Sequence, residues 1–337
     1  MGTSEPSVPS LGVIEDLDYW GLKYAAVKLA MELDLFTAVA AAGGRPEEIA
    51  GAIGVSQRGL RILADALCPL GLLHKSEGVY SLTPTAETFL VRGRPAFCAD
   101  ANLAFWRDRD RLPEAVRTGR ATLNLPGPQA EEVWAGLTAS DLVTWPLRVE
   151  TARERWALLG ITAETEPGLR VLDAACGCGL GSFVLAQADP TARITALDLP
   201  KVLAIAAQIA EQMGVREQVT FFPGDLLEVE FPAEQFDVVL FGAILYYFSP
   251  ERVTAVLRKA YRALVPGGRV VIRTVIADEE RCQDEMALWL AVELLHDAPD
   301  SEVYAFWQYQ AFLTVANFTE VTQHSNRLIS ARKLEDG

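Results

Sequence analysis

Hydrophobic and polar positions follow different patterns in the two halves of the chain. From Asp16 to Ala41 apolar residues recur at helical spacing, and Gly43-Gly44 ends that run. From Arg170 onward, short apolar runs alternate with helical segments, which predicts a mostly parallel α/β sheet covered by helices. Seven strands are expected, at 170–174, 193–198, 218–222, 236–241, 269–276, 319–323 and 327–332, the last two joined by a hairpin at 324–326.

The amino-terminal region predicts a winged helix. Ser56 is placed to cap a helix from Gln57 to Leu70, and Glu77-Gly78 forms the turn of a hairpin that follows it. Winged helices often bind DNA, but a recognition helix needs basic residues, and this one carries only Arg58 and Arg61. A protein–protein contact, usually a homodimer, is therefore the favoured role.

Composition narrows the classes of protein and partner. The chain has 337 residues, half of them hydrophobic, enough for two domains with large cores. Its net charge of −15 opposes binding to phosphate backbones, so no nucleic-acid partner is expected. The five cysteines are scattered and odd in number, which argues against a disulfide framework. We see neither a signal peptide in the polar segment 1–10 nor an apolar run of spanning length, and expect a cytoplasmic protein.

Three parts follow from these patterns. Residues 11–100 are expected to form the winged-helix domain, residues 101–160 a helical linker that walls a substrate pocket, and residues 161–335 the α/β domain. Pro126-Gly127-Pro128 marks a loop within the linker.

The most informative motif is a glycine-rich turn at 176–181. It follows the apolar strand at 170–174 and opens a helix, and the next strand, Ile194 to Leu197, runs into Asp198. A glycine turn followed by an acid at the next strand end predicts a nucleoside site. The glycines let the backbone approach the ligand, and the acid accepts hydrogen bonds from ribose hydroxyls.

Three further segments distinguish among nucleoside-binding families. A strand ends in Gly224-Asp225, where a carboxylate can accept from an adenine amino group. The strand at 236–241 leads to Gly242 at the ligand edge of the sheet. A Pro266-Gly267-Gly268 turn feeds the following strand.

Taken in order, these motifs resemble those of class I methyltransferases that use S-adenosyl-L-methionine (SAM). Segments 54–73 and 82–90 also resemble the dimerisation domain of plant-type small-molecule O-methyltransferases and their bacterial relatives. The resemblance implies a Rossmann-like seven-stranded methyltransferase domain behind a mostly helical winged-helix dimerisation domain. The segments that carry it in the catalytic domain are 171–181, 198–200, 224–226, 237–240 and 264–272.

The resemblance also implies roles for individual residues around SAM. Asp198 would hold both ribose hydroxyls. The other implied cofactor residues are Asp173, Ala175, Gly177 and Gly179 at the methionine and ribose end, Leu199, Gly224, Asp225 and Leu226 around the adenine, and Phe241 and Gly242 behind the cofactor. No metal is expected, because Cys176 and Cys178 lack a second pair of ligands at zinc spacing.

One departure from the family bears on the chemistry. Plant-type relatives carry a Leu-His-Asp-Trp signature whose His takes the substrate proton, and Tyr246 stands at that position here. A phenol with a pKa near 10 is a poor general base, although it can orient a substrate. The run at 244–246 is locally similar to bacteriochlorophyll C-20 methyltransferases, which methylate carbon. His296 is a second candidate catalytic residue.

Aromatic residues on either side of the SAM motifs suggest a pocket for an apolar, planar acceptor. The candidates are Phe105, Trp106, Trp145 and Trp289. We therefore expect a homodimeric enzyme that methylates a small molecule at carbon or oxygen and releases S-adenosyl-L-homocysteine (SAH). Two alternatives stay open: a SAM-binding protein that catalyses another reaction such as cyclisation, and a winged-helix DNA-binding regulator.

Overall fold

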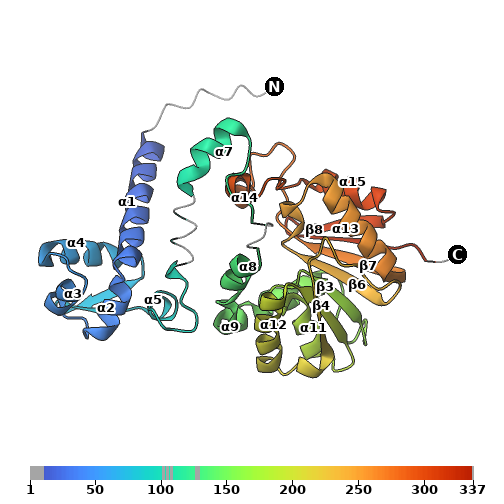
Figure 1. The fold of residues 1–337 in the computed structure, drawn as a ribbon, viewed down its shortest axis with the longest axis horizontal. Helices are drawn as coiled ribbons and strands as arrows, with labels where there is room; N and C mark the ends of the chain where they lie inside the picture. Colours follow the sequence, from blue (N-terminus) through green and yellow to red (C-terminus); the bar gives the residue numbers. More distant parts are fainter. Residues whose placement is uncertain (1–10, 101–102, 104–105, 107–108, 126–129, 336–337) are drawn as a thin grey trace, which may run out of the picture. The chain divides into compact units, whose positions relative to one another are not determined.

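The computed structural model describes residues 11–100, 103, 106, 109–125 and 130–335. The chain forms two compact units, residues 1–107 and 108–337, which run from blue to cyan and from green to red in Figure 1. Each unit has its own hydrophobic core. No helix among the described residues is both long enough and apolar enough to cross a membrane.

The amino-terminal unit has the helices and hairpin of a winged helix. Strands β1 and β2 pair in antiparallel fashion around Glu77-Gly78, and both turn residues have positive φ. The Ser56 side chain accepts a hydrogen bond from the Gly59 N–H at 3.0 Å, which confirms it as the cap of α4. The elements are α1 Gly12–Glu32, α2 Leu35–Ala41, α3 Pro46–Ala52, α4 Gln57–Leu67, β1 Leu73–Ser76, β2 Val79–Leu82 and α5 Pro84–Phe89.

The first predicted helix is wrong in one respect: it is broken in two at Leu33-Asp34. Asp34 has φ +53°, a left-handed conformation that ends α1 and begins α2. Its carboxylate accepts hydrogen bonds from the Thr37 hydroxyl at 2.6 Å and from Arg92 Nε at 3.2 Å. The apolar period alone did not reveal this break, because residues on both sides of it are buried in the same core. Helix α4 also ends at Leu67 rather than at Leu70.

The carboxyl-terminal unit is built on a seven-stranded sheet in the order β5-β4-β3-β6-β7-β9-β8. Strands β3 to β7 are parallel to one another, and β9 is antiparallel to both β7 and β8. The strands are β3 Arg170–Ala174, β4 Arg193–Asp198, β5 Val219–Pro223, β6 Phe236–Gly242, β7 Leu264–Arg273, β8 Thr319–Ser325 and β9 Leu328–Arg332. The described helices are α7 Leu112–Thr118, α8 Ala130–Thr138, α9 Asp141–Thr144, α10 Val149–Leu158, α11 Leu180–Ala188, α12 Pro200–Gln212, α13 Pro250–Ala263, α14 Glu285–Asp297 and α15 Phe306–Val315.

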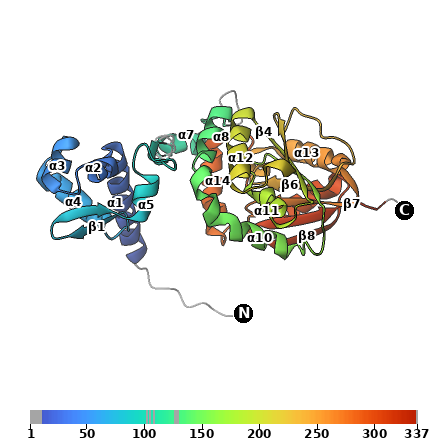
Figure 2. The same cartoon turned by 90° about the horizontal axis from the view of Figure 1, so that it is seen from below.

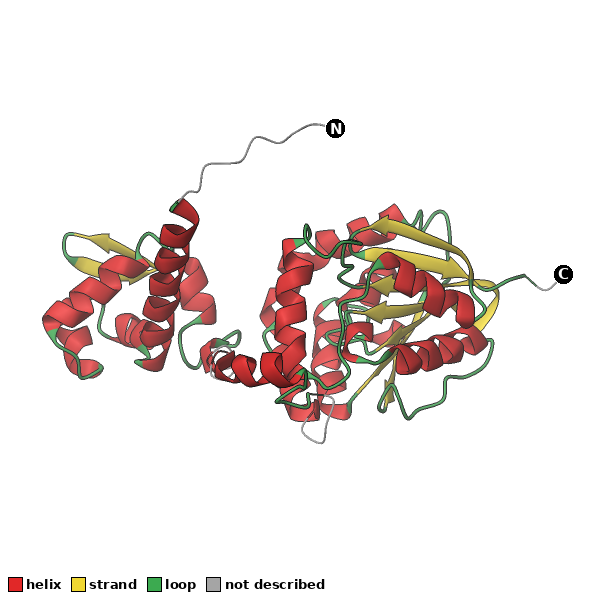
Figure 3. Cartoon of the chain, turned by 90° about the horizontal axis from the view of Figure 1, so that it is seen from above, coloured by secondary structure: helices red, strands yellow, loops and turns green. Residues whose placement is uncertain are grey.

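Helices cover both faces of this sheet, as Figures 2 and 3 show. Helices α10, α11 and α12 pack on one face, where Trp156 and Phe183 are buried. Helices α13 and α15 pack on the other, where Leu257 and Tyr309 are buried. Because β3 to β6 are parallel, the loops that follow them lie together at the carboxyl ends of the strands, where such folds usually bind their ligands.

The carboxyl-terminal strands differ from the prediction in extent. Strand β7 begins at Leu264, before the Pro-Gly-Gly segment, and ends at Arg273. The register against β6 shifts there, so that Leu264 pairs with Phe236 and Arg269 pairs with Val238. The glycines therefore form a bulge within the strand instead of a turn before it. The last strand of the chain, β9, lies between β7 and β8.

Gly44 and Gly43 offer a test of how the hairpin is seated. Both have positive φ, but a Cβ on Gly44 would lie 1.9 Å from the Tyr80 carbonyl oxygen, whereas a Cβ on Gly43 would meet nothing within 4 Å. We expect Gly43→Ala to cost only the left-handed penalty, about 1–2 kcal/mol. Gly44→Ala should cost more, because the Tyr80 N–H to Gly44 C=O bond (3.0 Å) must also be disturbed. Thermal denaturation of the full chain checks this, and equal losses for both variants would contradict it.

Candidate active site

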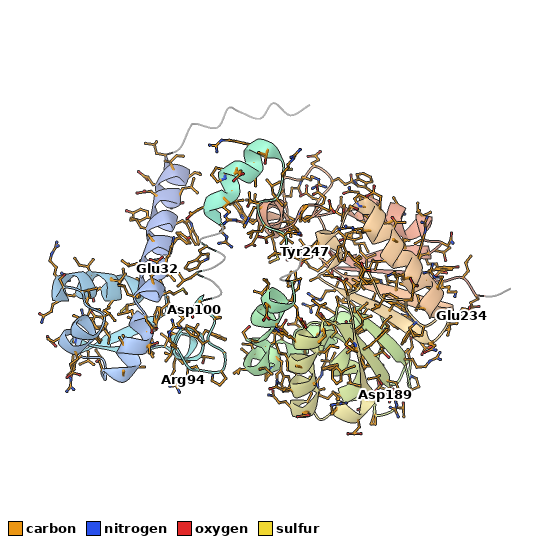
Figure 4. The ribbon with its side chains drawn as sticks, in the orientation of Figure 1. Glu32, Arg94, Asp100, Asp189, Glu234 and Tyr247 are labelled. Carbon is orange, nitrogen blue, oxygen red and sulfur yellow. The ribbon has the colours of Figure 1, made fainter. Side chains whose placement is uncertain are left out.

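A pocket lies at the carboxyl edge of the sheet, among the loops that follow β3, β4, β5 and β6. Its free volume is about 860 Å³ when the part open to solvent is counted. Tyr247, labelled in Figure 4, lines it just beyond the end of β6. Its lining comprises Ala130, Trp134, Thr138, Ala175, Gly177, Leu197, Asp198, Leu199, Val202, Gly224, Asp225, Leu226, Leu227, Gly242, Ala243, Ile244, Tyr247 and Phe248.

The glycine-rich turn between β3 and α11 forms the floor of this pocket. Ala175, Gly177 and Gly179 have φ of +62°, +56° and +75°. A Cβ on Gly179 would lie 2.2 Å from the Phe183 ring, so this glycine is needed for packing beneath the turn. A Cβ on Gly177 would meet nothing within 4 Å, so the space beside its backbone is open to a ligand.

Asp198 joins the loops around the pocket. Its Oδ2 accepts a hydrogen bond from the Gly177 N–H at 2.8 Å, and its Oδ1 accepts one from the Leu199 N–H at 2.7 Å. Its main-chain carbonyl accepts from the Gly224 N–H at 3.0 Å. Burial raises the pKa of Asp198, and the two backbone hydrogen bonds oppose that shift. Each carboxylate oxygen has a second lone pair for a ligand hydroxyl.

Three residues expected at the cofactor lie outside the pocket lining. Gly179 ends the turn and packs on the Phe183 ring. Phe241 is fully buried in the core on the α13 side. Asp173 is 2% exposed and accepts a 2.6 Å hydrogen bond from the Ser182 hydroxyl. Burial raises its pKa to about 7, opposed by that hydrogen bond and by the charge of Arg273. Asp173 thus supports the turn from behind. The other eight expected cofactor residues all line the pocket.

Tyr246 and Tyr247 occupy different environments. Tyr246 is 8% exposed and packs in a small cluster with Ala277, Leu294 and Val303. Its ring lies 4.9 Å from that of Tyr247, centroid to centroid. Burial raises the pKa of Tyr246, although the charge of Arg273 opposes this. Burial also raises the pKa of Tyr247. Neither phenol is therefore suited to accept a proton at neutral pH.

The remaining candidates are scattered. His296 is 1% exposed in the last turn of α14, with Nε2 3.2 Å from Asp297 Oδ1, and is not part of the pocket lining. Trp289 is 65% exposed on α14, and Trp145 donates to Gln212 Oε1 at 2.6 Å. Trp106 belongs to the amino-terminal unit, where it packs against Tyr24. Phe105 lies outside the described residues.

Sequence reasoning missed the contribution of α8. Ala130, Trp134 and Thr138, spaced by four residues on one helix face, cover part of the pocket. The Trp134 ring meets the Tyr247 ring edge to face at 5.1 Å. Lys201 fixes α8 to the start of α12 through a 2.9 Å bond from its N–H to Glu131 and an ion pair with Glu132. The four-residue spacing of these three residues was visible in the sequence, but the sequence did not show that this helix face covers the pocket.

The described residues hold no cluster of His, Cys, Asp and Glu side chains that could bind a metal ion. Burial raises the pKa values of the Cys176 and Cys178 thiols, so both are predominantly protonated at neutral pH.

Comparisons with known proteins identify the family. Residues 171–268 match the model of a methyltransferase domain, and residues 21–92 match that of the O-methyltransferase dimerisation domain. The chain is 30% identical over 311 residues to the tetracenomycin polyketide synthesis 8-O-methyltransferase TcmO of Streptomyces glaucescens, covering 87% of this chain and 86% of that one. The chain belongs to the SAM-dependent O-methyltransferase family. It is a SAM-dependent methyltransferase with an amino-terminal dimerisation domain.

Other relatives of this methyltransferase differ in the atom named as acceptor. It is 28% identical over 290 residues to 3-hydroxy-5-methyl-1-naphthoate 3-O-methyltransferase of Streptomyces sahachiroi, covering 81% and 79% of the two chains. It is 32% identical over 154 residues, 45% of this chain and 42% of the relative, to L-tyrosine C(3)-methyltransferase of Streptomyces lavendulae. Its fold matches human N-acetylserotonin methyltransferase in complex with SAM, with a TM-score of 0.75, 20% identity and coverage of 99% and 100%.

The raised pKa of Asp173 predicts that the stability of this methyltransferase depends on pH. Its folded-state pKa of about 7 exceeds the ordinary 3.8, so its ionisation opposes folding. Stability should therefore fall as pH rises from about 4 to about 7. Asp173→Asn keeps an acceptor for Ser182 and removes the charge, so the variant should gain on wild type by roughly 2–4 kcal/mol across that interval.

Asp189 supplies the matched control. Hydrogen bonds from Thr191 and Gly168 lower the pKa of Asp189, so its ionised form stabilises the fold. Asp189→Asn should therefore be less stable than wild type, most of all at neutral pH, whereas Asp173→Asn should be more stable there. Thermal melts of the three proteins between pH 4 and pH 8 check this. A difference between Asp173→Asn and wild type that is constant with pH would contradict it.

Proposed function

We propose that this enzyme transfers the methyl group of SAM to a small, planar aromatic acceptor, at carbon or oxygen. The observation that carries the proposal is the pocket itself, where Trp134 and Tyr247 meet edge to face beside Gly177 and Asp198. A flat ring fits between apolar and aromatic walls of this kind. The named acceptors of relatives, a naphthoate and tyrosine among them, are aromatic.

In this proposal, the carboxyl ends of β4 and β5 hold the nucleoside. Asp198 accepts hydrogen bonds from the ribose hydroxyls with its remaining lone pairs, and Leu199 and Leu226 contact the adenine. Asp225, whose Oδ1 already accepts from the Leu227 N–H at 2.8 Å, accepts from the adenine amino group. When bound, SAM supplies an electrophilic methyl group on sulfur. The protein's task is then to align the acceptor atom with that methyl group.

Positioning has a larger share here than proton transfer. Tyr246 is not part of the pocket lining, but its ring packs against that of Tyr247, which is. In this proposal the Tyr246 hydroxyl orients the acceptor, because a buried phenol donates a hydrogen bond well and accepts a proton poorly. His296 is a second candidate group, but it is buried at the end of α14 and is not part of the pocket lining. Acceptors that reach the enzyme already acidic, or that react at carbon, suit this arrangement.

We also propose a homodimer formed through the amino-terminal unit. Seven apolar side chains at the start of α1 are each more than 60% exposed: Leu11, Val13, Ile14, Leu17, Tyr19, Trp20 and Leu22. A patch of this size on one helix is typical of an interface. Leu22 lies within the matched dimerisation segment 21–92, and the other six residues directly precede it.

The reaction is tested by incubating the enzyme with SAM and a panel of phenols, naphthols and aromatic amino acids. We expect release of SAH and a product heavier by one methyl group. Tight SAM binding without any methylated product across the panel would contradict methyl transfer. The position of the new methyl group, read by NMR, distinguishes carbon from oxygen.

Tyr246→Phe removes only the hydroxyl that we assign to orientation. We expect kcat/KM to fall by about tenfold, the loss of one hydrogen bond, and not to vanish as it would for a general base. Tyr261→Phe, on α13 against Phe318, is the matched control and should retain full activity. Unchanged kcat/KM in Tyr246→Phe would remove this tyrosine from the mechanism.

Asp198→Ala should weaken SAH binding by about 100-fold, because two hydrogen bonds to a carboxylate are lost. Isothermal titration calorimetry measures the effect without any acceptor. Asp237→Asn is the control. Asp237 pairs with Arg170 at the amino ends of β6 and β3, away from the pocket, so this substitution should change stability and not SAH affinity. Wild-type affinity in Asp198→Ala would contradict the proposed ribose contact.

A further inference from the structure

We propose that Arg273 binds the carboxylate of an aromatic acid acceptor, an inference that rests on the proposed methyl transfer. Arg273 is the last residue of β7 and pairs in register with Gly242, which lines the pocket, although Arg273 itself is not part of that lining. A Cβ on Gly242 would lie 3.1 Å from Arg273 Nη2. Gly242 does not have positive φ, so the missing side chain makes room for the guanidinium group rather than for a backbone turn.

Among the described residues, no carboxylate lies within ion-pair distance of Arg273, although its charge acts on the buried acid Asp173. Ten other arginines of this unit pair with carboxylates, and of the remaining described ones only Arg155 and Arg273 are partly buried rather than exposed. The paired ones are Arg109, Arg148, Arg153, Arg170, Arg252, Arg262, Arg269, Arg281, Arg327 and Arg332. The partly buried Arg273 makes no side-chain hydrogen bond or ion pair within the described ranges. Asp173 is near enough to feel its charge, but burial holds the pKa of that acid at about 7 and Ser182 already occupies it.

A second arginine increases the local positive charge. Arg155 on α10 is also partly buried, and with Arg273, Gly181 and Trp156 it lines a small hollow that shares no lining residue with the pocket at Asp198. The pKa of Arg155 is lowered mainly by burial and further by the charge of Arg273. Two adjacent guanidinium groups in a partly dry site are unfavourable without an anion. The arrangement therefore calls for an anionic ligand.

The order of strands assigns this anion to the acceptor. The nucleoside residues Asp198 and Asp225 follow β4 and β5, and the glycine turn follows β3. Arg273 lies at the end of β7, two strands beyond β3 and on the side away from the nucleoside. It is also close enough to Tyr246 for its charge to act on that phenol.

A carboxylate suits this position better than a phenol does. A carboxylate is fully ionised at neutral pH, whereas a phenol with a pKa near 10 is not. The guanidinium fork binds two carboxylate oxygens at once and so fixes the plane of the attached ring. An acid group held by Arg273 would place the reacting atom of the ring beside Tyr246.

The test uses 1-hydroxy-2-naphthoate and 1-naphthol, which differ only in the carboxylate, as probes of the SAH-bound full-length enzyme. We expect wild type to bind the acid at least about tenfold more tightly than the naphthol, by calorimetry. Arg273→Gln should remove that preference and leave the dissociation constant of SAH within about twofold. Arg273→Lys, which keeps the charge without the fork, should retain part of it. Arg193→Gln, at the opposite edge of the sheet, should behave as wild type.

Several results would overturn the inference. If wild type binds 1-hydroxy-2-naphthoate no more tightly than 1-naphthol, the inference is wrong, whether or not any variant folds. Equal weakening of SAH and acid binding in Arg273→Gln would assign the cation to the methionine carboxylate of the cofactor. Failure of methyl transfer is distinguishable, because acid binding that depends on Arg273 would persist while no acceptor is methylated.

Discussion

The carboxyl group and carbonyl of Asp198 connect three loops, and the shape of the pocket depends on that connection. The side chain holds Gly177 of the turn after β3 and the N–H of Leu199 at the start of α12, while the carbonyl holds Gly224 after β5. The link to Gly224 needs only a main-chain carbonyl, whereas the link to the glycine turn needs a side-chain acceptor at position 198. Because the bonds use backbone N–H groups, the geometry is fixed whatever side chains surround it. The ligand then meets a preorganised edge rather than three separate loops.

The same edge holds backbone strain. Ala175 and Ala243 both line the pocket with φ near +60°, a region that alanine adopts at a cost of about 1–2 kcal/mol each. The Ala243 N–H donates to the Arg273 carbonyl at 2.7 Å, and the Cys176 N–H donates to the Leu197 carbonyl at 3.0 Å. These strand-end bonds hold each alanine in place. Strain maintained by surrounding bonds is common where a backbone must approach a ligand closely.

The sequence predicted the strands and the glycine turn because their signals are local. The β3 and β4 bounds agree with the expected ranges, and Ser56 caps α4 as expected. Features that depend on tertiary contacts were not predictable. The break at Asp34 depends on Thr37 and Arg92, the latter remote in sequence, and helical periodicity does not record such contacts. The roles assigned to individual site residues stay predictions.

The environment of a side chain was harder to predict than its position along the chain. Tyr246 and Tyr247 are adjacent, yet one is packed among aliphatic residues and the other lines the pocket. Two adjacent aromatic residues after a strand do not indicate in the sequence which ring faces the pocket and which is packed in the core. Trp134 was visible only as one tryptophan among seven. Its relation to Tyr247 arises from the packing of α8 on α12, which no local pattern encodes.

The place of β9 bears on how the protein is made. This strand is the last of the chain, yet it lies inside the sheet, between β7 and β8, and not at its edge. Just after it, Lys333 donates to the Leu264 carbonyl at 2.7 Å. Strand β8 can therefore join the other strands only after β9, which follows it in the sequence, has been synthesised and has paired with β7. Until then β7 presents an unpaired edge, a template for pairing with other chains. Loss of β9 would leave that edge of β7 without its antiparallel partner.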